Sequence, residues 1–242
     1  MDIEYLLALQ NLRQSLPLWV EQFLAAVSFV CDPRYLAVVI LMAYWCINKR
    51  SGMFLALCLV MGNFLTQVAK CFACVYRPWV RDSRIVPSRL ATGGATGYSF
   101  PSGHTTGAGA GFGGLAVVLY RKHKVLSVLC VLFVLLVAFS RNFLGVHTPQ
   151  DVLVALVISV GAVGFAVGFT RWIDKADANE PGHNKDIVAT VVVIAACVVI
   201  TVVLFLKPYP MDYVDGQLLV DPQKMMKDAC QSVGLLCGFM PG

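Results

Sequence analysis

The feature that most constrains the fold is a succession of long apolar segments separated by short polar connections. Of the 242 residues, 58% are hydrophobic and only 14% are charged, whereas about a quarter of the residues in a soluble domain are charged. Six segments approach the length that crosses a hydrocarbon core of about 30 Å: 35–47, 53–73, 104–120, 125–140, 152–172 and 187–206. Lipid offers the backbone no hydrogen bonds, so such segments must be helices. We predict an all-α polytopic membrane protein, a helical bundle of about six transmembrane spans.

The parts before and after these spans have a different character. The predicted regions are N-terminal amphipathic and short interfacial helices at 1–32, a transmembrane core at 33–206 and a tail at 207–242. Near the start, Leu6 and Leu9 alternate with polar residues such as Arg13, which is typical of a helix lying on the membrane surface. Whether the next helix, at 17–30, spans the membrane is left open. Asp32 and Pro33 then predict the start of a new helix, with Asp as its cap.

Charge placement predicts the orientation in the membrane. The basic residues of the spanning region gather in two very short connections, 48–52 and 121–124, which alternation puts on the same side. The positive-inside rule makes that side cytoplasmic, so the net charge of +5 indicates topology and not a nucleic-acid partner. The long polar connection 79–101 and the tail are then extracytoplasmic. A helix start at Asp221 followed by an apolar, glycine-rich end predicts either a re-entrant helix or a truncated span in the tail.

Three polar clusters are expected to meet at the extracytoplasmic side. They are Lys70 with Arg77 after the second span, Pro101-Ser102-Gly103-His104 opening the third, and Ser140-Arg141 with His147 and Asp151 between the fourth and fifth. Taken singly, each has an ordinary explanation. Basic residues snorkel at span ends, Ser102 suits a helix cap, and the sequence from Thr148 to Asp151 suits a capping box. Together on one face, they indicate a site.

The cationic members of these clusters predict a phosphate ligand. Lys70, Arg77 and Arg141 would place three positive charges around one pocket, and the planar guanidinium matches phosphate oxygens. Gly103 leaves room for close approach, and the free N–H groups where the third span begins suit an anion. The polar start of this span is therefore explained as part of an anion site.

Anion binding alone would not require two histidines. One imidazole, at His147, can attack phosphorus, while the other, at His104, protonates the leaving oxygen. Asp151 follows His147 by four residues and can accept from one ring nitrogen, leaving the other free. The acids of this face, chiefly Asp82 and Asp151, do not form the set that a two-metal phosphatase needs. No metal or other cofactor is therefore expected.

The nine cysteines do not form a recognisable metal-binding pattern. Cys71 and Cys74 form a lone C-x-x-C without a second pair, and we interpret them as small buried hydrophobic residues. A disulfide between Cys230 and Cys237 is permitted by their spacing but not required by it.

The combination K-x6-RP, PSGH and SR-x5-H-x3-D, found here from Lys70 to Asp151, resembles the signature of the type 2 phosphatidic acid phosphatase superfamily. The resemblance covers roughly 35–172. It implies metal-independent hydrolysis of lipid phosphates through a phosphohistidine. In that scheme the nucleophile is His147, the acid is His104, the orienting residue is Asp151, and the phosphate-binding residues are Lys70, Arg77, Ser102, Gly103 and Arg141. The segment 44–50 is similar to bacterial members, which implies a bacterial inner membrane with an extracytoplasmic active site.

Several hypotheses remain after this resemblance. Plausible substrates are undecaprenyl pyrophosphate, phosphatidylglycerophosphate and phosphatidic acid. A phosphotransferase would use the same site with another acceptor, and a non-catalytic lipid-binding or transport protein is a third alternative. Vanadium-dependent haloperoxidases share the motifs but are typically soluble. Arg81, Arg84 and Arg89 are either a positive funnel for anionic head groups or solvated loop charges. The oligomeric state is left open.

Overall fold

A computed structural model describes residues 2–95, 97–179, 184–214 and 217–239. The described residues form eleven helices and one two-stranded antiparallel hairpin. The helices are α1 (Asp2–Ser15), α2 (Leu18–Val30), α3 (Pro33–Cys46), α4 (Lys49–Ala73), α5 (Pro78–Arg81), α6 (Arg89–Thr92), α7 (Gly103–Leu119), α8 (Lys124–Phe143), α9 (Pro149–Asn179), α10 (Asn184–Leu206) and α11 (Pro222–Phe239). The hairpin pairs β1 (Tyr213–Val214) with β2 (Gln217–Leu218). The predicted all-α class is confirmed.

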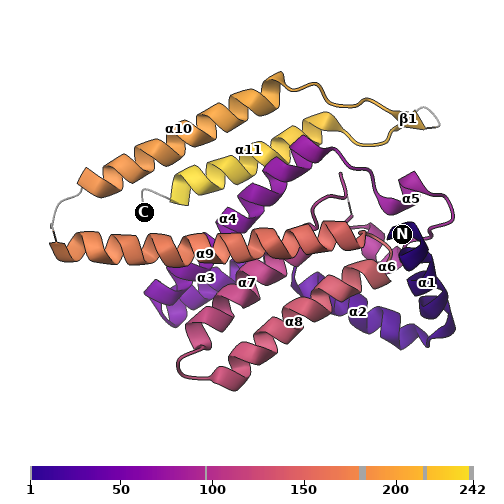
Figure 1. The fold of residues 1–242 in the computed structure, drawn as a ribbon, viewed down its shortest axis with the longest axis horizontal. Coiled ribbons are helices and arrows are strands. Elements are labelled where there is room, and N and C mark those ends of the chain that lie inside the picture. Colours follow the sequence, from indigo (N-terminus) through magenta and orange to yellow (C-terminus); the bar gives the residue numbers. More distant parts are fainter. Residues whose placement is uncertain (1, 96, 180–183, 215–216, 240–242) are drawn as a thin grey trace.

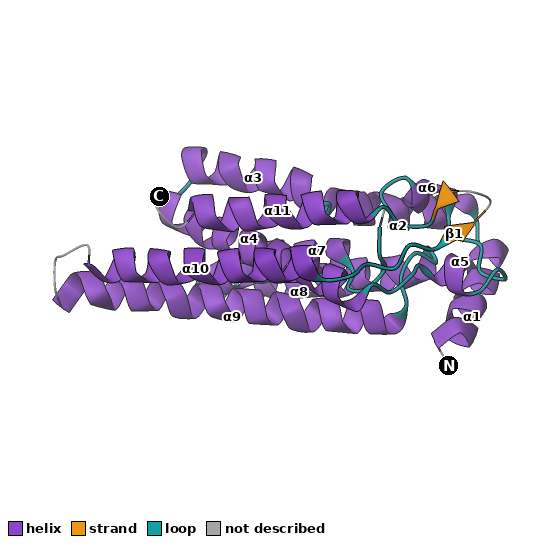
Figure 2. Ribbon diagram, turned by 90° about the horizontal axis from the view of Figure 1, so that it is seen from above, coloured by secondary structure: helices purple, strands orange, loops and turns teal. Residues whose placement is uncertain are grey.

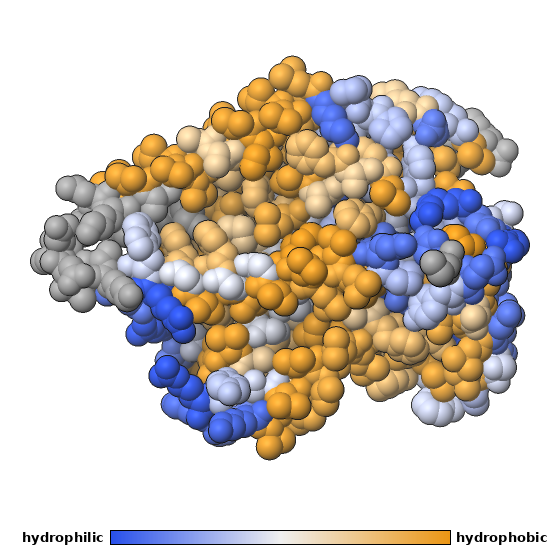
Figure 3. All heavy atoms as spheres, in the orientation of Figure 1, coloured by the Kyte–Doolittle hydropathy of each residue, from blue (hydrophilic) through white to orange (hydrophobic). Residues whose placement is uncertain are grey.

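Most of the helices run along one long axis (Figure 1), and on the face drawn in Figure 3 their apolar side chains form a band. Figure 3 shows hydrophobic side chains across the middle of the molecule and hydrophilic ones gathered at opposite ends. One hydrophilic end lies over α1, α5 and α6, and the other includes the turn between α7 and α8 (Figures 1 and 3). We call these the α5 end and the opposite end. This distribution is that of a membrane protein.

Among the described residues, three helical segments are long and apolar enough to cross a membrane: Lys49–Arg81, Lys124–Phe143 and Pro149–Asp174. Helices α2 and α3, bent by 54° at their junction, could form a fourth span together. The apolar part of α10, Thr190–Leu206, is shorter. The predicted segments 104–120 and 187–206 are helical, as α7 and α10, but the number of spans stays a prediction.

Local sequence explains where the helices begin. Asp32 caps α3 by accepting from the backbone N–H of Arg34, and Pro33 is the first helical residue, as predicted. Ser102 caps α7 by accepting from the N–H of Thr105. Helices α3 and α7 therefore each begin with a polar residue at the α5 end of the molecule. That end is where the predicted site residues gather.

Helix α7 is the centre of the bundle and packs against α8, α4 and α9 (Figure 1). Its small residues permit this close packing. At Gly109, an added Cβ would overlap the side chain of Ser159 on α9. At Gly113, on the same helix, an added Cβ would meet only Val163 Cγ2, at an ordinary 3.9 Å. Gly109 is therefore a point where α7 and α9 approach too closely for any side chain.

The N-terminal helix α1 is tied to loops at the α5 end. Arg13, expected on a solvent-facing or lipid-surface side, is instead buried, with 8% of its surface exposed. Its guanidinium donates to the carbonyl of Phe143 at 3.1 Å and to that of Val86 at 2.5 Å. A buried arginine persists because these carbonyls replace its water, so α1 braces the C-terminal end of α8.

The tail returns into the bundle. After α10 and the hairpin, α11 runs along α4 and α10 (Figures 1 and 2). Its buried face consists of Met225, Ala229, Ser232 and Leu236. All nine cysteines are free, so the disulfide that the spacing of Cys230 and Cys237 permitted is not formed. Helix α11 is therefore held by packing.

The close approach at Gly109 generates a prediction about stability. Gly109→Ala should destabilise the protein by about 1–3 kcal/mol, since overpacking forces α7 and α9 apart. Gly113→Ala is the matched control, because both changes add the same methyl group and the same helix propensity. Thermal unfolding in detergent measures the difference. Equal melting temperatures for the two variants would contradict this account of α7.

Candidate active site

Lys70 lies in the last turn of α4, and Arg77 lies beyond the end of that helix. A turn, and not a continuous helix, brings these two cationic residues together. The helix ends at Ala73, and Cys74 adopts a left-handed conformation with φ of 48°. Because the helix ends between them, Lys70 and Arg77 do not share a helical face. Instead, both reach the segment before α7: Lys70 Nζ donates to the carbonyl of Tyr98 at 2.7 Å, and Arg77 Nε to that of Gly97 at 3.1 Å.

His147 lies in the short connection between α8 and α9. This connection turns at Gly145, whose φ of +71° favours glycine. Thr148 and Asp151 then form the predicted capping box of α9, with 2.8 Å from Thr148 N to Asp151 Oδ2 and 3.3 Å from Asp151 N to Thr148 Oγ1. Because α9 begins there, the carboxylate of Asp151 is fixed beside the His147 ring.

The two ring nitrogens of His147 have different surroundings. Nδ1 lies 3.5 Å from Asp151 Oδ2 and 3.4 Å from Ser99 Oγ. Nε2 lies 3.0 Å from Arg77 Nη1, which also donates to the carbonyl of Val146 at 3.0 Å. A carboxylate beside Nδ1 favours the proton there, so Nε2 keeps its lone pair. Burial, with the Arg77 guanidinium adding to it, holds the pKa of His147 well below 6.5, and the ring is neutral at pH 7.

Ser99 was not among the residues selected from the sequence. Its hydroxyl donates to Asp151 Oδ2 at 2.5 Å and is fully buried between that carboxylate and His147. The sequence signal that could have indicated Ser99 was its position, two residues before the Pro101-Ser102-Gly103-His104 cluster. Ser99 joins the segment before α7 to the cap of α9, which holds two of the three predicted clusters together.

Arg141 is buried at the end of α8, with 2% of its surface exposed. Its Nη1 donates to Ser28 Oγ on α2 at 2.6 Å. Within the described part of the chain, its Nε and Nη2 have no hydrogen-bond partner. A buried guanidinium with unused N–H groups is costly unless an anion binds it. Ser28, like Ser99, was missed by sequence reasoning.

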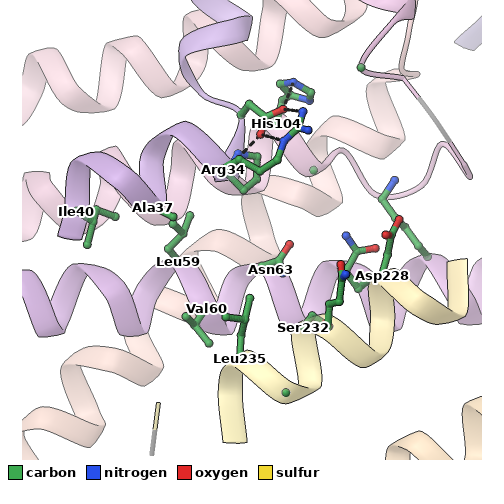
Figure 4. A pocket seen from close by; sticks show the side chains of 18 of the residues that line it. Arg34, Ala37, Ile40, Leu59, Val60, Asn63, His104, Asp228, Ser232 and Leu235 are labelled. Atoms are coloured by element: carbon green, nitrogen blue, oxygen red, sulfur yellow. Dashed lines mark hydrogen bonds and ion pairs between the residues drawn. The ribbon is translucent and has the colours of Figure 1, made fainter. Parts of the chain in front are cut away.

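His104 occupies the first turn of α7. Its Nε2 lies 4.0 Å from Asp32 Oδ2, the carboxylate that caps α3 and pairs with Arg34 at 2.8 Å. Figure 4 shows His104 near Arg34, above α3. From the sequence, Asp32 was assigned only as a helix cap. In the structure, the same carboxylate also lies beside His104, the predicted general acid.

A cavity of about 970 Å³ opens among these groups. Its wall includes five of the predicted site residues: Lys70, Arg77, Gly103, His104 and His147. The other three, Ser102, Arg141 and Asp151, are buried and do not line it. Two imidazoles and two cations thus face one cavity, with a third cation nearby. Such a set can hold a phosphate and supply both a nucleophile and an acid.

The arginines of the long connection have other contacts. Arg84 pairs with Asp82 at 2.8 Å and with Glu4 at 3.2 Å, and Arg81 pairs with Asp2 at 3.3 Å. Neither these arginines nor Arg89 lines the cavity. Their exposed ion pairs are those of loop charges.

Two curated proteins are similar to this chain. One is the undecaprenyl-diphosphatase BcrC of Bacillus subtilis (strain 168), 39% identical over 80 residues, which is 33% of this chain and 38% of that protein. The other is an undecaprenyl-diphosphatase of Sulfolobus acidocaldarius, 29% identical over 106 residues, or 44% of this chain and 48% of that protein. The chain therefore spans less than half the length of each. No solved structure matches it.

Residues 51–178, more than half of the chain, match the PAP2 superfamily. The matched range contains all eight predicted site residues, from Lys70 to Asp151. The chain belongs to the PAP2 superfamily.

Proposed function

We propose that this enzyme hydrolyses a lipid phosphate or pyrophosphate through a phosphohistidine on His147, without a metal. The observation that carries the proposal is the asymmetry of the His147 ring. Its Nδ1 is held by Asp151 and Ser99, and its Nε2 points to Arg77 at the cavity. The Nε2 lone pair accepts from Arg77 Nη1 in this structure, and it becomes the nucleophile when that N–H turns to a phosphate oxygen.

The first chemical step forms one bond and breaks another. Nε2 of His147 attacks phosphorus, and the bond from phosphorus to the lipid or phosphate oxygen breaks. His104 donates a proton to that leaving oxygen. Lys70, Arg77 and Arg141 stabilise the negative charge on the transferring group, because buried cations act strongly where water is excluded. Asp151 stabilises the positive charge that develops on the His147 ring.

The second step returns the enzyme to its starting state. A water molecule attacks phosphorus, His104 now accepts its proton, and the bond to Nε2 breaks to release inorganic phosphate. A phosphotransferase would differ only here, with another hydroxyl in place of water. Equal amounts of free phosphate and dephosphorylated lipid at every turnover distinguish hydrolysis from transfer.

Candidate substrates are undecaprenyl pyrophosphate, phosphatidylglycerophosphate and phosphatidic acid. The names of the two similar curated proteins support the first. We place the site at the extracytoplasmic side of a bacterial inner membrane. The support for this orientation is the cluster Arg121, Lys122 and Lys124 in the turn at the opposite end of the bundle.

The nucleophile assignment predicts the effect of removing one imidazole. His147→Ala should lower phosphate release from a lipid phosphate in detergent with EDTA on the order of 10³-fold or more, since no other group can form the intermediate. His123→Ala is the control, because His123 is an exposed histidine at the opposite end. Retained activity in His147→Ala would refute the assignment. A wild-type protein that binds lipid phosphate without turnover would support the non-catalytic alternative.

The contacts of Ser99 predict a positioning role. Ser99→Ala should lower kcat by about tenfold to a hundredfold with little change in KM, because the His147 ring loses its alignment but the phosphate keeps its cations. Ser127→Ala is the control, since that buried hydroxyl bonds only the carbonyl of Ala116 at 2.9 Å in the turn region far from the site. A raised KM with unchanged kcat, or an equal loss in both variants, would contradict this role.

A further inference from the structure

Asp32 lines the cavity but has no part in the reaction as described above. It lies at the bend between α2 and α3, with 8% of its surface exposed. It precedes the segment 51–178 that matches the family, so the match assigns it no role. To cap α3 it uses Oδ1, which accepts from the N–H of Arg34 at 2.9 Å. An asparagine would cap a helix as well, so the cap does not explain the negative charge.

The ion pair with Arg34 does not explain that charge either. Asp32 Oδ2 lies 2.8 Å from Arg34 Nη2, but the Arg34 side chain is 81% exposed, and ion pairs with such a partner contribute little to stability. The same local pattern occurs at Asp82. There Oδ1 accepts from the N–H of Arg84 at 2.9 Å, and Oδ2 lies 2.8 Å from Arg84 Nη2. Asp82 does not line the cavity. What distinguishes Asp32 is therefore its tertiary surroundings.

Close packing places the carboxylate of Asp32 beside the ring of His104. Gly107 follows His104 by one turn of α7, and an added Cβ there would meet the carbonyl oxygen of Cys31 at 3.0 Å and Pro33 Cγ at 3.2 Å. The bend on both sides of Asp32 therefore lies directly against α7. Asp32 Oδ2 is 4.0 Å from His104 Nε2, and the two side chains are only 11% and 16% exposed. Figure 4 shows His104 next to Arg34, the other partner of this carboxylate.

The other charges that act on the His104 ring are mostly positive. Arg141 at the end of α8, Arg77 before α5 and Lys70 on α4 all contribute. These cations repel a ring that carries an additional proton, yet a general acid must carry one. The carboxylate of Asp32 attracts the protonated ring and so offsets part of this repulsion.

We propose that Asp32 is a positioning residue for His104, which holds the protonated ring by its Nε2–H so that Nδ1–H faces the leaving oxygen. Both nitrogens of a protonated imidazole carry hydrogen. When the bond from phosphorus to the leaving oxygen breaks, its electron pair stays on that oxygen, which takes the Nδ1 proton. The ring is then neutral, and Nδ1 can accept a proton from the attacking water in the second step. The inference rests on the proposed phosphatase function.

The first test compares two phosphate esters that differ by one methylene group, p-nitrobenzyl phosphate and p-nitrophenyl phosphate. The benzyl alkoxide needs a proton to leave, whereas nitrophenolate is a stable anion that leaves without one. Asp32→Asn should lower kcat/KM for the benzyl ester by about tenfold to a hundredfold and that for the phenyl ester by less than about threefold. A change in affinity for the phosphate group would affect both esters alike, so the ratio isolates proton donation.

Asp82→Asn is the matched control. It changes the same pair of atoms in the same local pattern, and Asp82 does not line the cavity. Its ratio of kcat/KM for the two esters should equal that of the wild-type protein. Activity on p-nitrophenyl phosphate reports that each variant has folded.

The outcomes separate the two proposals. If the wild-type protein releases phosphate from neither ester nor from a lipid phosphate, the proposed function fails. If it does release phosphate but Asp32→Asn lowers both esters equally, or lowers neither, Asp32 does not position the acid. The same change of ratio in Asp82→Asn would also overturn the assignment.

The second measurement uses dioleoyl phosphatidic acid, a lipid phosphate whose leaving group is likewise an alkoxide. Asp32→Asn should lower kcat by about tenfold to a hundredfold. KM and the inhibition constant of inorganic phosphate should rise by less than about threefold, because the phosphate keeps its cations. A loss of inhibition by phosphate as large as the loss in kcat would show that Asp32 only supports the structure of the site, and would overturn the positioning role.

Discussion

Three cationic side chains, Lys70, Arg77 and Arg141, are buried at one end of a membrane protein, and their mutual repulsion must be offset there. Neutral hydrogen-bond acceptors offset part of the cost of burying these cations. Backbone carbonyls of Tyr98 and Gly97 accept from the first two, and a serine hydroxyl accepts from the third. In the proposed function, a phosphate dianion supplies the missing negative charge. On that proposal, the same cations whose burial is costly give the site affinity for a phosphate and stabilise the charge of the transferring group.

The bundle holds these groups through helix ends. Helix α7 begins and α8 finishes near the site, and α9 begins with the capping box that fixes Asp151 beside His147. The close contact of α7 with α9 at Gly109 makes the relative position of these helices rigid. Arg13 adds a contact from α1, because it donates to the carbonyl of Phe143 just before the connection that carries His147. Helix packing at a distance from the cavity thus sets the positions of the candidate site residues.

Much of this was predictable from the sequence, because its signals are local. Hydropathy located the helices, and capping residues such as Asp32, Ser102 and Thr148 located their starts. What the sequence did not predict depends on tertiary contacts. Ser99 and Ser28 are ordinary serines until folding places them beside Asp151 and Arg141. Likewise, nothing local shows that α11 returns along α4 to line the cavity.

The convergence of two imidazoles and three cations on one anion is the central claim. The most direct measurement is an experimental structure of the protein with orthovanadate, which adopts the geometry of a transferring phosphoryl group. The account predicts vanadium bonded to Nε2 of His147, with Lys70, Arg77 and Arg141 around its oxygens and His104 on the leaving side. Vanadate bonded through His104 instead, or bound away from these residues, would contradict it.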